Sequence, residues 1–252
     1  MFFLSSLSKN EVKYINALQI KKYRQEYGSF LVEGSKSVLE LLDSDFEIEF
    51  IAATETFLKD NEKQFIQSGI SIKTTSQDTL SKIGTLQTND SCAAVVKTKE
   101  NAFLCAEANE IVLVLDDIRD PGNLGTIIRI ADWYGISKII CSNSTTDWYN
   151  PKVIAANKGS FTRVSSFYTD LPDFFRQTSP QTIFGTFLDG QNIHQLKIRK
   201  PEGYVVMGNE SNGISEDVEP FITQKITIPR FGKAESLNVG IATAIVLDNL
   251  HR

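Results

Sequence analysis

Histidine, cysteine and long apolar runs are all scarce in this chain of 252 residues. The two histidines, His194 and His251, are too few for a histidine-rich zinc site or a histidine-based catalytic triad. The three cysteines, Cys92, Cys105 and Cys141, lie far apart and form no Cys-x-x-Cys pair. We interpret them as buried free thiols in a reducing compartment, and we expect neither a disulfide nor a bound metal.

Membrane and export signals are also missing. No apolar run approaches the roughly 20 residues that span a bilayer, and Met1 to Lys9 lacks the basic leader and apolar stretch of a signal peptide. The sequence therefore predicts a cytoplasmic protein without a membrane segment. The net charge of −5 is unusual for a nucleic-acid binder, because phosphate contacts require clustered Lys and Arg. A protein of this charge could still bind nucleic acid through a local basic patch.

The first hundred residues alternate helix-like and strand-like segments, which is typical of a small α/β domain with its own core. Between residues 99 and 108 the pattern loosens into mostly polar residues. We therefore expect a linker there, joining a domain at 1–98 to a second domain at 109–252. The helix-like segments are 8–27 and 38–42, and the strand-like ones are 30–34, 48–53 and 93–96.

The second half is built differently, from continuous apolar runs separated by helical stretches. Such runs are the signature of strands that are covered on both faces, so the fold class is α/β, with a mainly parallel sheet between helices. Ligands of such sheets bind beyond the carboxyl ends of the strands. The expected strands are 111–115, 138–141, 182–186, 204–207 and 225–228.

The first strand of this half ends in acidic residues, turns through Pro-Gly-Asn and enters a helix. Asn123 is placed to cap the helix, and Gly135 is expected to end it. Arg129 follows roughly a turn and a half into the helix, where it could meet a phosphate or a developing alkoxide. On spacing alone, an ordinary turn followed by an exposed arginine explains this segment equally well.

Two later strand ends carry further unusual residues. After residue 207, Gly208 and Gly213 flank Glu210, and glycine lets a backbone approach a flat ligand closely. After residue 228, Ser236 is expected as an N-cap, with Asn238 in the first helical turn. The helix that follows is apolar almost all round, which indicates a buried or interfacial position.

Together these three segments resemble the three motifs of the SpoU (TrmH) family of RNA 2′-O-methyltransferases, within the knotted SPOUT superfamily. In that family the blocks D-P-x-N-x-G-x-x-x-R, G-x-E-x-x-G and I-P-x-x-G-x-x-x-S-L-N-V occur in this order. The matching segments are 120–129, 208–213 and 228–239. In addition, residues 30–34 and the helix after them are similar to the family's L30e-like RNA-binding extension, whereas 157–160 departs from a Ser-Ala-Gly-Ala-like stretch of many relatives.

The resemblance implies a deep trefoil knot, which no periodicity argument predicts. It also implies S-adenosylmethionine as the cofactor, a homodimer, and methylation of a ribose 2′-hydroxyl in structured RNA. Carried over residue by residue, it assigns the reaction to Arg129, Asn123, Glu210, Ser236 and Asn238. It assigns cofactor contacts to Thr186, Gly208, Ile228 and Leu237.

Arg129 corresponds to a residue that is sometimes described as a general base. Because a guanidinium stays protonated, our hypothesis is that Arg129 instead stabilises the developing alkoxide, with an RNA phosphate as a candidate proton acceptor. Basic residues that could meet RNA are Lys9, Lys13, Lys21, Lys22, Arg24, Lys152, Lys158 and Arg163.

Several readings of the function remain open. Among RNA substrates, 23S rRNA is favoured over tRNA because of the N-terminal extension, by analogy alone. A different class is a non-catalytic RNA-binding or ribosome-assembly protein that has kept the fold, but such a protein would be free to lose the five residues assigned to the reaction. A nucleotide-dependent oxidoreductase is disfavoured by the missing Gly-x-Gly-x-x-Gly fingerprint.

Overall fold

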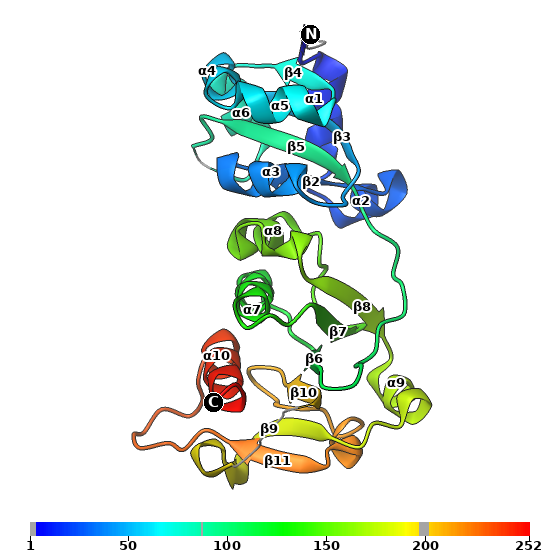
Figure 1. The fold of residues 1–252 in the computed structure, drawn as a ribbon, viewed down its shortest axis with the longest axis vertical. Coiled ribbons are helices and arrows are strands. Elements are labelled where there is room, and N and C mark those ends of the chain that lie inside the picture. The colour runs from blue at the N-terminus through cyan, green and yellow to red at the C-terminus, as the bar shows by residue number, and fades with distance from the viewer. Residues whose placement is uncertain (1–3, 87, 197–201) are drawn as a thin grey trace. The chain divides into compact units, whose positions relative to one another are not determined.

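The computed structural model describes residues 4–86, 88–196 and 202–252. They form two compact units, one made of Met1–Glu100 and Tyr149–Thr162, the other of Asn101–Trp148 and Arg163–Arg252. Figure 1 shows both units as sheets covered by helices. The domain limits suggested by the sequence, 1–98 and 109–252, stay a prediction.

The first unit contains a five-stranded sheet in the order β1-β4-β3-β5-β2, in which β5 runs antiparallel to both of its neighbours. Alternation along β2 sends Phe30 and Val32 into one core and Leu31 into another, on opposite faces of the sheet. The strands are β1 (Leu4–Ser6), β2 (Ser29–Glu33), β3 (Ile48–Ala53), β4 (Ile72–Thr74) and β5 (Cys92–Lys97).

Helices cover both faces of this sheet. Residues of α1 and α6 contribute to the core that holds Leu31, and residues of α3, α4 and α5 to the core that holds Phe30. Ile154 and Phe161, distant in sequence, complete the second core. The helices are α1 (Lys9–Ala17), α2 (Lys21–Tyr27), α3 (Ser35–Leu42), α4 (Glu55–Asp60), α5 (Glu62–Ser68), α6 (Gln77–Ile83) and α8 (Pro151–Asn157), with the 3-10 turn η1 (Ser160–Thr162).

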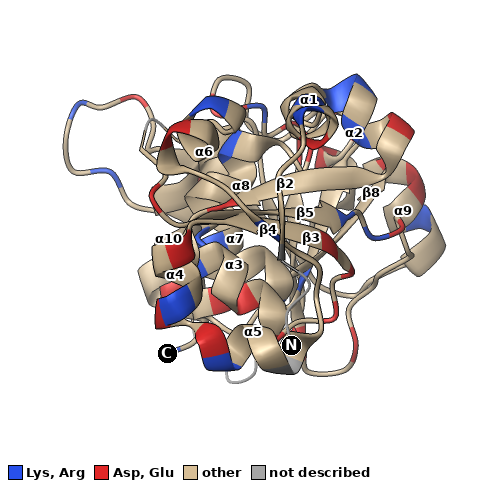
Figure 2. Ribbon diagram, turned by 90° about the horizontal axis from the view of Figure 1, so that it is seen from above, with Lys and Arg blue, Asp and Glu red and all other residues tan. Residues whose placement is uncertain are grey.

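The predicted helical segment 8–27 is two helices rather than one. A capping box between Ser8 and Glu11 starts α1, and Gly28, in a left-handed conformation at φ 59°, ends α2. Lys and Arg lie along both helices (Figure 2). Arg24 is an exception to the predicted RNA-facing group, because it is buried and its Nη1 donates to the Leu18 carbonyl at 2.8 Å.

The second unit contains a six-stranded sheet in the order β11-β9-β10-β6-β7-β8. Every pairing in it is parallel, which confirms the predicted α/β class. One strand, β8, was not expected from the sequence. The strands are β6 (Ile111–Leu115), β7 (Lys138–Ser142), β8 (Ser165–Thr169), β9 (Ile183–Asn192), β10 (Gly203–Met207) and β11 (Gln224–Thr227).

Helices again complete this unit. The α9 helix packs its phenylalanines into a core with β6 and β10, while α7 and α10 pack against each other. Figure 1 shows α7 and α10 side by side. The remaining elements are α7 (Pro121–Trp133), α9 (Leu171–Thr178), α10 (Val239–Leu250), η2 (Ile193–Gln195) and η3 (Glu219–Phe221). The trefoil knot stays a prediction, since residues 197–201 of this unit lie outside the described residues.

Two predicted helix caps are wrong. Asp120, not Asn123, caps α7, because its Oδ1 accepts from the Asn123 amide at 2.8 Å. Asn238, not Ser236, caps α10, accepting from the amides of Gly240 and Ile241. The predicted end of α7 is confirmed, since Gly135 follows it with φ 71°.

The three cysteines are free thiols, but Cys105 is half-buried rather than buried as predicted. Cys92 and Cys141 are buried, and burial raises the pKa of the Cys92 thiol to about 12 and that of Cys141 further still. In the part of the chain that the structure describes, no helix has both the length and the hydropathy of a membrane span.

Candidate functional site

The carboxyl ends of four neighbouring strands meet at one edge of the second sheet. Because β11, β9, β10 and β6 are adjacent and parallel, the segments that follow them are neighbours in space. These segments carry the sequence motifs. The sheet therefore brings together three stretches of chain that are far apart in the sequence.

A chain of hydrogen bonds joins the three motifs at this edge. The Asn238 Nδ2 donates to the Asn123 Oδ1 at 2.8 Å, and the Asn123 Nδ2 donates to the Glu210 Oε1 at 2.5 Å. The orientation of both amides follows from this pattern, because the Asn238 oxygen is already used to cap α10. The carboxyl group of Glu210 is therefore the acceptor at the end of this hydrogen-bond chain.

A second set of contacts holds the turns that carry these residues. The Asp116 Oδ2 accepts from the Ser215 amide at 2.7 Å, and the Asn209 Nδ2 donates to the Asp117 carbonyl at 2.8 Å. Asp117 has a positive φ of 60°, which is unusual for a residue other than glycine. Its amide donates to the Ser142 hydroxyl, which helps to hold this conformation. The loop after β6 is thus tied to the turn after β10.

Sequence reasoning did not assign a role to Asp116, Asp117 or Asn209. The signal that could have found them is the acidic pair directly after a buried strand, since a buried carboxylate needs hydrogen-bond donors. Asp116 is 5% exposed and obtains its donor from the Ser215 amide, two residues beyond the motif that follows β10. Which donor a buried carboxylate finds is decided only by the fold.

Arg129 and Ser236 do not take part in the hydrogen-bond chain. Arg129 is exposed on α7 and has no hydrogen-bond or ion-pair partner among the described residues. It stands four residues before Trp133, so both side chains lie on one face of the helix. Ser236 is exposed in the loop before α10. The structure thus brings together Asn123, Glu210 and Asn238, and leaves Arg129 and Ser236 apart from them.

Of the four predicted cofactor residues, Gly208, Ile228 and Leu237 follow strand ends on the same edge, whereas Thr186 lies within β9. Regular pairing of β9 with β10 and β11 ends at Gly185, and residues 186–190 bulge out of the ladder, so Thr186 starts this bulge rather than ending the strand. The Thr186 hydroxyl donates to the Val206 carbonyl at 3.2 Å. Gly208 opens the turn after β10, where a Cβ would lie 2.2 Å from the Gly213 carbonyl carbon.

These residues fit a cofactor with a flat apolar base. Ile228 is half-buried and Leu237 is 47% exposed, so both present apolar surface to solvent or to a ligand. Gly208 admits no other residue without displacing the turn. A base can stack on such aliphatic surface while backbone amides and carbonyls recognise its edge.

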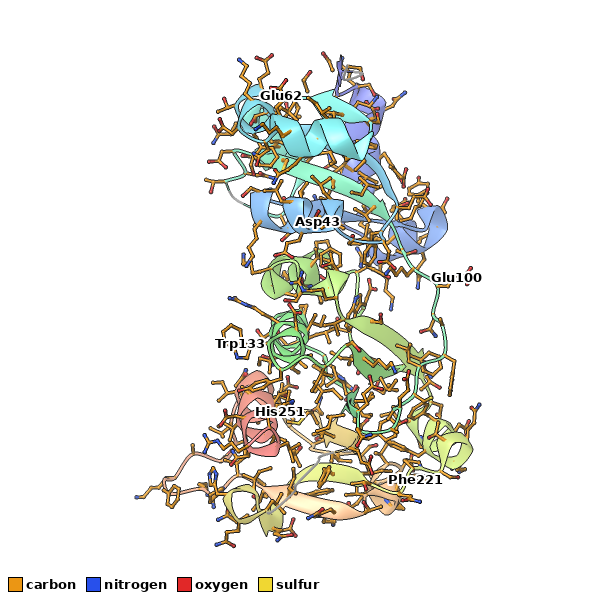
Figure 3. The ribbon with its side chains drawn as sticks, in the orientation of Figure 1. Asp43, Glu62, Glu100, Trp133, Phe221 and His251 are labelled. Carbon is orange, nitrogen blue, oxygen red and sulfur yellow. The ribbon has the colours of Figure 1, made fainter. Side chains whose placement is uncertain are left out.

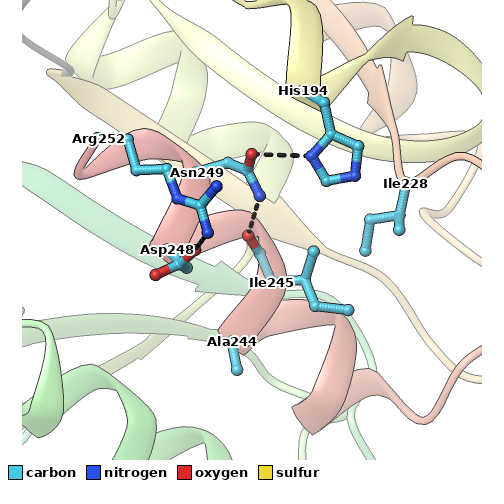
Figure 4. Close-up of a pocket in the computed structure, with 7 residues that line it drawn as sticks. All are labelled: His194, Ile228, Ala244, Ile245, Asp248, Asn249 and Arg252. Carbon is cyan, nitrogen blue, oxygen red and sulfur yellow. Dashed lines mark hydrogen bonds and ion pairs between the residues drawn. The ribbon is translucent and has the colours of Figure 1, made fainter.

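A pocket of about 430 Å³ opens beside Ile228 (Figure 4). It lies between the end of β11, the η2 turn and one face of α10. The His194 Nδ1 and the Asn249 Oδ1 are 3.0 Å apart across one side of it, and Asp248 pairs with Arg252. The lining residues are His194, Ile228, Ala244, Ile245, Asp248, Asn249 and Arg252.

The side chains of the site are polar but do not gather as metal ligands. Among the residues that the structure describes, no group of His, Cys, Asp or Glu is arranged to hold a metal ion. The site consists of amides, carboxylates, glycine turns and the exposed guanidinium of Arg129.

Two family models match the chain. Residues 110–248 match the SpoU rRNA Methylase family. Residues 9–94 match the MRM3-like substrate binding domain. The first match alone covers more than half of the chain and contains all three motifs of the site.

Relatives match over nearly the whole length. The chain is 30% identical over 251 residues to the 23S rRNA (guanosine(2553)-2′-O)-methyltransferase RlmP of Bacillus subtilis (strain 168), covering 98% of each. It is similar to the structure of an AdoMet-bound rRNA methyltransferase from Sinorhizobium meliloti, with a TM-score of 0.86, 29% identity, and coverage of 98% of this chain and 96% of that one. A structure assigned to the TrmH family, from Porphyromonas gingivalis, gives a TM-score of 0.85 with 31% identity and 98% coverage of both chains.

Proposed function

The chain belongs to the SpoU rRNA methylase family, and on that premise we propose that it methylates a ribose 2′-hydroxyl of 23S rRNA. The observation that carries the proposal is the hydrogen-bond chain Asn238–Asn123–Glu210, which unites all three motifs. The relative RlmP, matched from end to end, supports large-subunit rRNA over tRNA as the substrate. We place the activity in the cytoplasm, where this RNA is found.

S-adenosylmethionine is the proposed cofactor, and when bound it supplies a methyl group on an electrophilic sulfonium. The AdoMet-bound structure that this chain resembles supports the choice. Gly208 and Thr186 would offer backbone groups to the cofactor, while Ile228 and Leu237 would offer apolar surface. Their arrangement at adjacent strand ends fits this assignment.

Arg129 is proposed to act on the ribose oxygen. Transfer of a methyl group requires the hydroxyl to lose its proton as the new bond forms, so negative charge develops on that oxygen. A guanidinium stabilises this charge without accepting the proton, which would pass to an RNA phosphate. Asn123, Glu210 and Asn238 would keep the nucleotide and the cofactor in line, and Ser236 would orient the ribose or the cofactor's carboxylate end.

Residues 1–98 are proposed to bind the RNA, and residues 109–252 to carry out the reaction. The match of residues 9–94 to a substrate binding domain supports this division. Lys9, Lys13, Lys21 and Lys22 are exposed on α1 and α2, where they can meet phosphates. They supply the local basic patch that the acidic chain needs.

The proposal is tested by methyl transfer. The purified protein is incubated with tritiated S-adenosylmethionine and either 23S rRNA or bulk tRNA from cells that lack it. We expect label in 23S rRNA, recovered after digestion as one 2′-O-methylated nucleotide that resists alkaline cleavage. Label in tRNA alone would move the substrate to tRNA. No label in either RNA, despite cofactor binding measured by calorimetry with NADH as a control, would leave a non-catalytic RNA-binding protein.

A homodimer is proposed, with the exposed face of α7 and α10 between the two copies. Trp133 is 84% exposed and Ile241 is 56% exposed, which is unusual for large apolar side chains. Figure 3 shows Trp133 projecting from α7, and Tyr134 lies near His251 at the end of α10, with ring centroids 5.3 Å apart. Because Arg129 shares the face of Trp133, a second copy would lie beside the arginine.

Replacing Trp133 with glutamate is expected to convert the dimer into monomers. A charge in an apolar interface costs desolvation, and burying the large indole is the main gain of the contact. Light scattering after size-exclusion chromatography measures the mass. In the Trp133→Glu protein, the methylation rate should fall together with the mass. Ile66→Glu, at an exposed site on α5, is the control that should leave the mass unchanged. A Trp133→Glu protein that remains dimeric would place the interface elsewhere.

A further inference from the structure

The loop between β11 and α10 carries the most exposed large hydrophobic side chain that the structure describes. Phe231 is 96% exposed. Residues 228–238 form no helix or strand and extend outward from the second unit in Figure 1 and Figure 2. A phenylalanine exposed to water does not stabilise the folded state, because hydrophobic stabilisation is proportional to the apolar area that is buried. Its position therefore calls for a ligand.

The neighbours of Phe231 are cationic. Arg230 precedes it and Lys233 follows two residues later, and both are exposed. The Arg230 Nη1 donates to the Ala234 carbonyl at 3.3 Å, which closes the loop around the aromatic residue. An aromatic ring between two cations, on a chain whose net charge is −5, is the combination that recognises single-stranded nucleotides: the ring stacks on a base and the cations meet phosphates.

The loop is anchored at the site already described. It starts at Ile228 and ends at Asn238, whose side chain donates to Asn123. Phe231 is thus separated by only a few residues from both the proposed cofactor surface and the hydrogen-bond chain. A base stacked on it would belong to the nucleotide that presents the reacting ribose, or to its neighbour.

We propose that Phe231 is a stacking platform for a base of the RNA substrate, with Arg230 and Lys233 on the flanking phosphates. The inference rests on the proposed RNA methylation and names the contact that holds the target nucleotide. A second copy of the chain is the less favoured occupant, because Arg, Gly and Lys flank Phe231 in the sequence and interface cores are depleted of lysine. The exposed apolar face with Trp133 and Ile241 fits that role better.

The test compares Phe231→Ala, Phe231→Leu and Phe231→Trp in the full-length protein. Stacking predicts that the alanine variant binds 23S rRNA about five- to a hundredfold more weakly and that its KM for RNA rises to match. Phe231→Trp should restore binding, and Phe231→Leu should not, because only an aromatic face stacks on a base. Affinity for S-adenosylmethionine and the mass in solution should not change. Phe103→Leu makes the same substitution at another exposed phenylalanine, in the predicted linker, and should leave RNA binding intact.

Fluorescence gives a readout that does not depend on methylation. In the Phe231→Trp variant, rRNA should quench the introduced indole beyond any change of Trp133 and Trp148 in the parent protein, so stacking can be detected even if no methyl transfer occurs. Full restoration by leucine would contradict stacking, as would unaltered RNA binding of Phe231→Ala. Weaker cofactor binding would assign the ring to the cofactor pocket instead, and a fall in mass would assign it to the interface between copies.

Discussion

Arg129→Ala is expected to reduce kcat for RNA methylation about 100- to 1000-fold while leaving the affinity for S-adenosylmethionine unchanged. In the proposed mechanism the guanidinium is required only when negative charge develops on the ribose oxygen, so its loss affects the transition state rather than the bound ground state. In the structure Arg129 is exposed and has no partner among the described residues, so its removal breaks no contact there. Single-turnover rates with saturating RNA measure the effect.

Arg129→Lys separates charge from geometry. Lysine keeps the positive charge but lacks the planar pair of donors, and we expect it to recover only part of the lost rate. Arg176→Ala, which removes an exposed arginine on α9, serves as the control and should retain the full rate. Wild-type turnover by Arg129→Lys would contradict a two-donor role, and wild-type turnover by Arg129→Ala would remove the residue from the reaction.

Asn123→Asp is expected to lower kcat/KM about ten- to a hundredfold, although it changes a single amide into a carboxylate of the same size. Asn123 donates to Glu210 and accepts from Asn238. An aspartate keeps the acceptor but loses the donor, and it places a second negative charge beside Glu210. The turn after β10 would then be pushed away from the helix α7.

The pH dependence and a second substitution test this explanation. Two carboxylates in contact raise the pKa of one of them, so a shared proton restores the missing donor as the pH falls. The defect of Asn123→Asp should therefore shrink at low pH and grow at high pH, relative to the parent protein.

Asn123→Asp combined with Glu210→Gln should recover activity, because glutamine can donate where asparagine did. Gln177→Glu, exposed on α9, controls for the added charge. A double variant as impaired as the single one would contradict the hydrogen-bond chain.

The sequence by itself determined the class of fold and predicted the place of the candidate site. Continuous apolar runs such as 111–115 and 204–207 indicate strands that are covered on both faces, and recognising them required no knowledge of partners. The three motifs follow such runs, so the rule that ligands bind beyond strand ends predicts the place of the candidate site. The amphipathic stretch after Pro121 and the glycine at 135 likewise determined α7.

Only the tertiary structure decided which polar groups meet. Asn123 and Ser236 both looked like caps, since local sequence favours either residue there, but Asp120 and Asn238 cap the helices and release the Asn123 side chain to bridge Glu210 and Asn238. Tertiary structure likewise decided that Arg24 is buried, that Asp116 accepts from the Ser215 amide and that Asp117 has a positive φ. A hydrogen bond between residues 87 or 115 positions apart depends on strand order, and strand order is set by packing of whole layers rather than by any local pattern.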